Sequence, residues 1–75
     1  MKVTIYDYNN EPTVVEITKK VKSSVLIELS GDQCLYVEYE DGQTEWFDSS
    51  EDRWQSSFDG VSFVKLSDGL DLKRG

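Results

Sequence analysis

The dipeptide Asp41-Gly42, set between two alternating segments, constrains the fold of this chain more than any other feature of its sequence. Residues 34–40 alternate apolar and polar side chains, and residues 43–47 form a second short run of this kind after the dipeptide. An Asp-Gly pair between two such runs is typical of a β-hairpin with a two-residue type I′ turn, because this turn requires positive φ. The sequence therefore predicts an antiparallel hairpin over residues 34–47.

Alternation of apolar and polar side chains also indicates β-strands elsewhere. These further strands are expected over residues 2–6, 13–18, 23–29 and 61–66. A helical turn is expected near residues 49–55, where Ser49 or Ser50 can act as the N-cap and Trp54 folds back as an apolar anchor. We therefore expect an all-β fold: a small antiparallel barrel, or a strongly bent sheet of five to six strands, with one short helical turn.

The length of the chain, 75 residues, suits one small core and therefore a single domain over residues 1–75. Residues 67–75 are expected to form a tail that frays or adds a short edge strand. No signal peptide opens the sequence, and no apolar run approaches the roughly 20 residues needed to span a bilayer. The single cysteine cannot form an internal disulfide. We therefore expect the chain to be cytoplasmic and to have no contact with a membrane.

The charge of the chain is segregated. Its net charge is −7, and residues 38–59, with eight carboxylates and the single base Arg53, account for all of it. The rest is balanced and includes a small basic cluster at Lys19, Lys20 and Lys22. An acidic field repels phosphate backbones, so we expect no direct nucleic-acid binding and instead a basic protein surface or a Lys/Arg-rich peptide as partner. The alternative is that the charge only maintains solubility.

A two-residue turn at Asp41-Gly42 determines which side chains of the hairpin share a face. One face is then candidate core and consists of Leu35, Val37, Tyr39, Thr44 and Trp46. The other face is acidic and aromatic and consists of Tyr36, Glu38, Glu40, Gln43, Glu45 and Phe47. On it Glu38 opposes Glu45, an arrangement that destabilises a sheet.

Acidic groups beside aromatic rings are suited to binding a lysine or arginine side chain through ion pairs and cation–π contacts. The predicted partner-binding residues are therefore Tyr36, Glu38, Glu40, Asp41, Glu45, Phe47, Asp48, Glu51 and Asp52. The alternative is that the aromatic rings cover a neighbouring strand or the tail, and that the glutamates are simply solvated.

Residues 37–54, VEYEDGQTEWFDSSEDRW, resemble the second half of Tudor-like domains. In that family a strand often ends in Tyr-acid-Asp-Gly, the return strand contains Glu-Trp, and a polar turn closes with an acid-x-Arg-Trp-like element. The resemblance implies a five-stranded SH3-like barrel. For many members it also implies an aromatic cage that binds methylated lysine or arginine.

Carried over by position, the resemblance makes Tyr39 a cage wall and Asp41 a charge partner. The predicted pairing of the hairpin instead points Tyr39 toward the core. Tyr39 can be both a core residue and a cage wall only if it lies near the mouth of the barrel. Tudor-like readers usually bring further aromatics from an early strand and from the first loop between strands. Residues 21–33 of this chain contain none, which leaves Tyr6 and Tyr8 as candidates.

Catalytic and metal-binding chemistry has little support in the sequence. Histidine is absent, which removes the usual general base at neutral pH and the commonest metal ligand. Cys34 alone cannot form a Cys–His pair or a zinc site, and it is expected to be a small buried apolar residue. We therefore expect no enzymatic activity, no cofactor and no metal.

Three functions remain open from the sequence. The first is an acidic interaction protein that docks on the basic, nucleic-acid-binding surface of a protein; standalone chains of this size and charge resemble small phage inhibitors that act by charge mimicry. The second is a Tudor-like reader of methylated lysine or arginine peptides. The third is a structural component whose exposed strand or patch completes a larger assembly.

Overall fold

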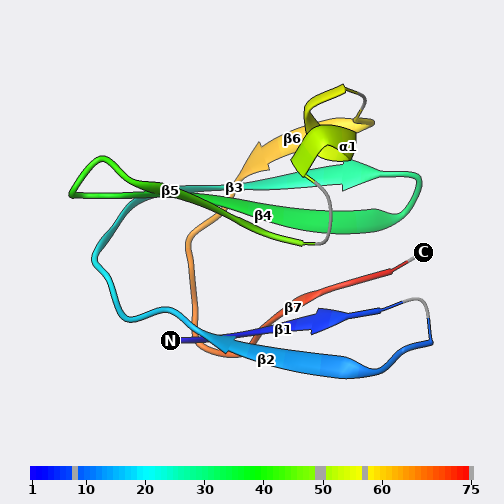
Figure 1. Ribbon diagram of the computed structural model, residues 1–75, viewed down its shortest axis with the longest axis horizontal. Coiled ribbons are helices and arrows are strands. Elements are labelled where there is room, and N and C mark those ends of the chain that lie inside the picture. The colour runs from blue at the N-terminus through cyan, green and yellow to red at the C-terminus, as the bar shows by residue number, and fades with distance from the viewer. Residues whose placement is uncertain (8, 49–50, 57, 75) are drawn as a thin grey trace.

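The strands of this protein form two sheets that face each other (Figure 1). The computed structural model describes residues 1–7, 9–48, 51–56 and 58–74, and of residues 51–53 only the backbone. In chain order the elements are β1 (Lys2–Tyr6), β2 (Pro12–Glu16), β3 (Val21–Leu29), β4 (Asp32–Tyr39), β5 (Thr44–Phe47), α1 (Glu51–Ser56), β6 (Gly60–Phe63) and β7 (Leu70–Leu72). The predicted all-β fold with one short helical turn is confirmed.

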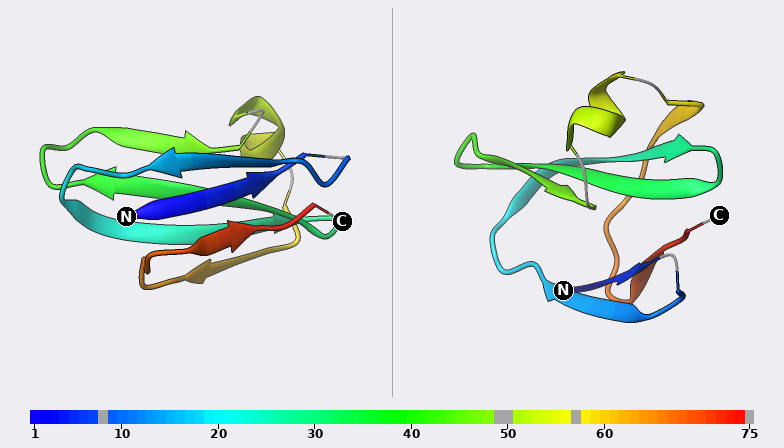
Figure 2. Two further views of the ribbon diagram at one scale, coloured as in Figure 1. Left: turned by 90° about the horizontal axis from the view of Figure 1, so that it is seen from below. Right: turned by 45° about the vertical axis from the view of Figure 1, so that its right-hand side comes forward.

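The smaller sheet has the strand order β2-β1-β7 and the larger one β5-β4-β3-β6. Figure 2 shows the two layers from two further directions, with α1 on the outer side of the larger sheet. All strand pairs are antiparallel except β1 with β7, which is parallel. Within the described part of the chain the two sheets form a sandwich and do not close into a barrel.

The main core lies between the sheets and is built by the alternating residues of each strand. Its buried members are Val3, Ile17 and Leu72 on the side of the smaller sheet and Leu35, Val37, Tyr39 and Phe47 on the side of the larger one. Val3, Leu35 and Val37 are completely inaccessible to solvent. The sequence correctly predicted that Leu35, Val37 and Tyr39 share an inward face.

A second apolar cluster lies on the outer face of the larger sheet, beneath α1. Trp54 of α1 is 1% exposed and packs with Ile27 of β3 and Cys34 of β4. The predicted role of Trp54 as an anchor is therefore confirmed. Because α1 covers the outer face here, the central strand β4 is buried on both sides.

The hairpin between β4 and β5 has a three-residue loop, so the predicted two-residue turn was wrong. A type I′ turn requires positive φ at both central residues, but of the pair only Gly42, at 86°, has it. The amide of Gly42 donates to the carbonyl of Tyr39 (3.0 Å), and the amide of Tyr39 donates to the carbonyl of Gln43 (2.8 Å). This is the pattern of a type I turn followed by a glycine bulge.

The additional loop residue shifts the register by one and turns the side chains of β5 to the faces opposite those predicted. Leu35 now opposes Phe47, and Tyr36 opposes Trp46. The tight turn with two positive φ angles occurs instead between β3 and β4, at Ser30 (50°) and Gly31 (84°).

The C-terminal segment adds an edge strand rather than fraying, which is the second of the two predicted alternatives. β7 pairs with β1 over Val3–Leu70 and Ile5–Leu72. Leu72 is 1% exposed in the main core. The last described residues therefore complete the smaller sheet.

Candidate functional site

The register of the hairpin separates the two glutamates that were predicted to face each other. Glu38 opposes Thr44 on the outer face of the sheet, and Glu45 opposes Val37 on the inner side. There the carboxylate of Glu45 accepts a hydrogen bond from the hydroxyl of Tyr39 at 3.2 Å. The predicted acidic and aromatic face of the hairpin is therefore not one surface.

Two of the predicted partner-binding residues are inside the molecule. Phe47 is 4% exposed in the main core, because the register shift turns it inward. The side chain of Asp48 is fully buried and forms an ion pair with Arg74. Their prediction as surface residues was wrong.

The remaining predicted partner-binding residues are spread over the hairpin and beyond it. Glu40 and Asp41 are exposed in the loop. Glu38 lies on the outer face with its carboxylate 3.9 Å from the ammonium of Lys22, and Tyr36 packs there against Trp46. The side chains of Glu51 and Asp52 fall outside the described residues.

The two residues of the predicted cage, Tyr39 and Asp41, contact a lysine of the chain itself. The ammonium of Lys19 lies 5.2 Å from the ring centroid of Tyr39 and 3.3 Å from the carboxylate of Asp41. It also donates to the side-chain carbonyl of Gln43. Tyr39 is only 5% exposed, so its ring is part of the core as well as a contact for Lys19.

These contacts change the acidity of both residues. Burial raises the pKa of the Tyr39 hydroxyl, and the neighbouring carboxylate of Glu45 raises it further. The pKa of Asp41 is lowered, first by a hydrogen bond from the backbone amide of Gln43 and then by Lys19. Both pKa shifts are caused by burial and by neighbouring groups at the hairpin. Neither shift moves a pKa toward neutral pH, so neither residue becomes an acid or base that titrates there.

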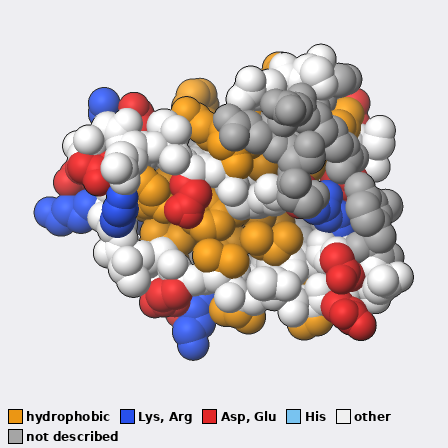
Figure 3. Space-filling model, viewed as in Figure 1, with side chains coloured by type: hydrophobic (Ala, Val, Ile, Leu, Met, Phe, Trp, Pro, Cys, Tyr) orange, Lys and Arg blue, Asp and Glu red, His pale blue; other side chains and the backbone are white. Residues whose placement is uncertain are grey.

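A hollow of about 440 Å³ opens between the two sheets alongside β5. On this side of the molecule Figure 3 shows hydrophobic side chains gathered between the sheets, with acidic side chains beside them. Ile5, Val15 and Phe47 contribute apolar lining, and Tyr6 and Trp46 also border the hollow. Its carboxylates come from Asp7, Glu45 and the buried Asp48, and its base from Arg74. Glu45, Phe47 and Asp48 are therefore brought together, in a hollow that the sequence did not predict.

The outer face of the larger sheet carries a row of apolar side chains. Cross-strand pairing aligns Phe63, Val25, Tyr36 and Trp46, one from each of the four strands. The rings of Tyr36 and Trp46 have their centroids 4.7 Å apart, and Phe63 is 84% exposed. This row was not predicted, because the pairing of β3 with β6 joins segments far apart in the sequence.

A buried ionic cluster ties the C-terminal segment to the rest of the fold. Arg74 and Asp32, whose side chains are each 5% exposed, lie 3.7 Å apart, and Arg74 also pairs with Asp48. The Nε of Arg74 donates to the carbonyl of Tyr6 at 3.0 Å. Sequence reasoning missed this cluster, because a single arginine in a polar tail carries no periodic signal.

Cys34 is fully buried, and desolvation raises the pKa of its thiol to about 12, so it is not a nucleophile near neutral pH. No group of three or more metal-ligating side chains occurs among the residues that the structure describes. Over the same residues, no helix has the length and apolar character needed to cross a bilayer.

Comparisons with protein families, with curated proteins and with solved structures give no match for this chain. The resemblance of residues 37–54 to Tudor-like domains therefore stays a prediction. Inferences about function depend on the surfaces described above.

Proposed function

We propose that this chain is a non-enzymatic interaction module that binds a positively charged segment of a protein partner in the hollow alongside β5. The observation that carries this proposal is the composition of the hollow. Apolar walls and the carboxylates of Asp7 and Glu45 line it together. The hollow belongs to a chain with a net charge of −7.

The hollow suits a lysine or arginine side chain better than an entirely apolar one. The long aliphatic stem of either residue packs on apolar surface while its charged end stays at the opening. Ile5 and Val15 supply such a surface. Glu45 offers a carboxylate for a charge-assisted hydrogen bond.

The overall charge favours partners with a basic surface, including surfaces that otherwise bind nucleic acid. An acidic field accelerates the encounter with a basic partner and slows it with an acidic one. A small phage-type inhibitor that mimics nucleic acid charge is the biological role most consistent with this. Association is then fast at low salt and weakens as salt rises.

The test is an NMR titration of the protein with peptides that contain lysine or arginine, at about 0.02 M and about 0.3 M salt. We expect saturable shifts at residues 5–7 and 45–48, weakened by Glu45→Gln. Asp71→Asn is the matched control, since Asp71 is exposed on β7 and lies outside the hollow. Shifts absent from the hollow, or equal weakening by both variants, would show that the hollow is not the site.

The Tudor-like alternative is favoured by one contact, that of Lys19 with Tyr39 and Asp41. It predicts tighter binding of trimethyllysine peptides than of unmodified ones, with shifts at residues 39–43. Replacing Lys19 with alanine should strengthen that binding, because the chain's own cation no longer occupies the two residues. Equal affinity for the two peptides would exclude this alternative.

A role in assembly is favoured by the exposure of Phe63 on the edge strand β6. An unpaired edge with an exposed apolar ring is a template for association with another chain. Sedimentation analysis of the protein and of Phe63→Ser tests this. A concentration-dependent oligomer that Phe63→Ser abolishes supports assembly, and a monomer in both cases argues against self-association.

A further inference from the structure

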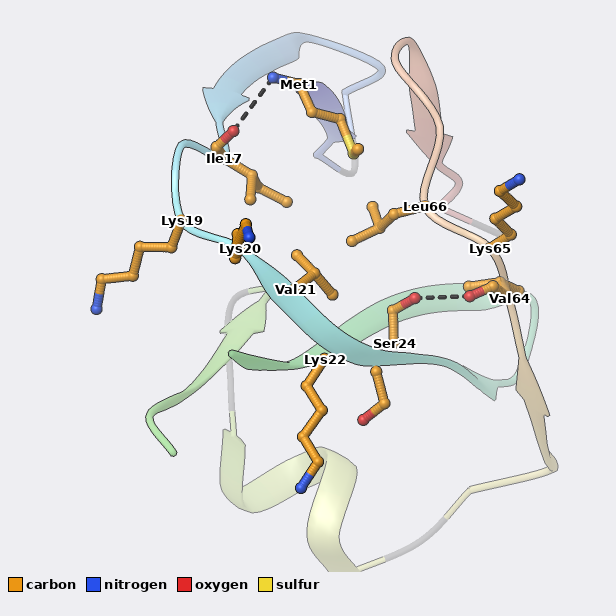
Figure 4. A pocket seen from close by; sticks show the side chains of 11 residues that line it. Met1, Ile17, Lys19, Lys20, Val21, Lys22, Ser24, Val64, Lys65 and Leu66 are labelled. Atoms are coloured by element: carbon orange, nitrogen blue, oxygen red, sulfur yellow. Dashed lines mark hydrogen bonds between the residues drawn. The ribbon is translucent and has the colours of Figure 1, made fainter. Parts of the chain in front are cut away.

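A second cavity, of about 470 Å³, lies between the segment that leads into β3 and the segment that follows β6. Met1, Ile17, the first residues of β3 and residues 64–66 line it (Figure 4). Its size falls within the range of roughly 300–1,000 Å³ that is usual for small-molecule sites. It is separate from the hollow alongside β5, with which it shares no lining residue.

Apolar side chains meet across the middle of this cavity. In Figure 4 the side chains of Met1, Ile17, Val21 and Leu66 approach one another across it. Ser24, at its base, is satisfied internally, because its hydroxyl donates to the carbonyl of Val64 at 2.6 Å. The interior therefore suits an alkyl chain rather than a sugar or a nucleotide base.

The cavity is bordered by lysines, although the protein as a whole is acidic. Four of the six lysines of the chain line it: Lys19, Lys20, Lys22 and Lys65. Lys19 and Lys22 point away from the cavity in Figure 4, and they pair with Asp41 and Glu38 respectively. These two lysines are therefore already neutralised.

Lys20 and Lys65 are the two lysines that remain available at the cavity. They stand on the two segments that flank it (Figure 4), and both are exposed. Neither forms an ion pair with a carboxylate in the part of the chain that the structure describes. In Figure 4 the Lys65 side chain points outward, but the flexible four-carbon stems of Lys20 and Lys65 allow both ammonium groups to turn toward an anion at the opening. The lining contains no carboxylate side chain.

We propose that this cavity binds an alkyl carboxylate, a medium-chain fatty acid or a molecule of the same chemistry. The alkyl chain lies among Ile17, Val21 and Leu66, and the carboxylate pairs with Lys20 and Lys65 at the opening. Apolar burial supplies the attraction for the chain, and the two ammonium groups select an anion over a neutral or cationic end group. This site is independent of the partner-binding role proposed for the hollow.

The test compares decanoate, decanol and decyltrimethylammonium in NMR titrations of the whole protein. All three carry the same chain, so any difference between them reports the end group. We expect saturable shifts at residues 17–24 and 64–66 with decanoate, and weaker binding of the other two compounds. Equal binding of all three, or shifts confined to the outer face around Phe63, would overturn the proposal.

Paired lysine substitutions provide the second arm. Lys20→Gln with Lys65→Gln should weaken decanoate binding about tenfold, since two charge-assisted contacts are lost. Lys2→Gln with Lys73→Gln is the matched control: it makes the same change of charge outside the cavity and should leave the affinity within about twofold. Equal weakening by both pairs would mean that only the net charge matters and that the cavity is not an anion site.

Discussion

The ammonium of Lys19 lies over the ring of Tyr39, 5.2 Å from its centroid. The same ammonium is 3.3 Å from the carboxylate of Asp41, so the chain binds its own lysine with the two residues that a Tudor-like cage would use. An external lysine would have to displace Lys19 to reach them. This contact also anchors the segment before β3 to the hairpin loop.

The ionisation of Asp41 provides a direct test of these contacts. Its pKa is below the usual value of 3.8, because the amide of Gln43 and the ammonium of Lys19 both stabilise the carboxylate. Because the pKa of Asp41 is lower in the folded state than in the unfolded state, the ionised carboxylate stabilises the fold at any pH above its ordinary pKa. This stabilisation is lost as the pH falls through the lowered pKa of the folded state. We expect a carboxyl NMR titration to place the midpoint of Asp41 below pH 3.8.

Lys19→Met separates the two causes. The midpoint of Asp41 should rise in this variant but stay below the ordinary value, because the amide of Gln43 still donates to the carboxylate. A midpoint unchanged by the substitution would show that Lys19 does not contact Asp41 in solution.

The two tryptophans should contribute very differently to stability. Trp54 is 1% exposed and covers Cys34, so Trp54→Ala should lower the free energy of unfolding by about 3–5 kcal/mol. Trp46 is only half-buried, and Trp46→Ala should cost about 1–2 kcal/mol. Urea denaturation measures both. Labelling of the Cys34 thiol should become faster only in Trp54→Ala. Comparable losses of stability in the two variants would contradict the difference in burial between the two tryptophans.

Arg74 should be essential to the fold although it lies near the C-terminus. Arg74→Met removes the guanidinium that pairs with the buried carboxylates of Asp32 and Asp48, which should cost about 3–5 kcal/mol. Lys73→Met, at the exposed neighbouring position, is the control and should change stability by less than about 0.5 kcal/mol. Asp48→Asn added to Arg74→Met should recover part of the loss. Similar denaturation curves for the two single variants would argue against a buried cluster.

Replacing Gly42 in the hairpin loop with alanine should destabilise the fold. Gly42 has a φ of 86° and no atom near the position of an added Cβ, so Gly42→Ala adds only backbone strain, of about 1–2 kcal/mol. Gly60 is equally open and lacks a left-handed φ, and Gly60→Ala should be close to neutral. Thermal denaturation distinguishes the two. A neutral Gly42→Ala would indicate a different turn.

Local sequence patterns predicted the strands better than their pairing. The alternation of Leu35, Val37 and Tyr39 indicated an inward face because side chains alternate strictly along a strand, and the core contains all three. The position of Trp46 was mispredicted because it depends on the loop length. One additional residue in a turn reverses every side chain that follows.

Most of the candidate site depends on contacts that no local pattern contains. The hollow draws Ile5 and Val15 from the first two strands to the side of Glu45. The lysine-lined cavity draws Lys20 and Lys65 from segments more than forty residues apart in the sequence. Composition indicated an acidic chain with a basic partner, but only the sandwich determines which charges become neighbours.

The parallel pairing of β1 with β7 also has a consequence for synthesis of the protein. A ribosome releases residues 2–6 long before residues 70–72, so the first strand must wait for its second neighbour until residues 70–72 have been translated. During that interval Val3 does not yet pack against Leu72, with which it shares the main core. We therefore expect the nascent chain to acquire its native smaller sheet only after residues 70–72 leave the exit tunnel, and chains that stall earlier to be targets for proteases.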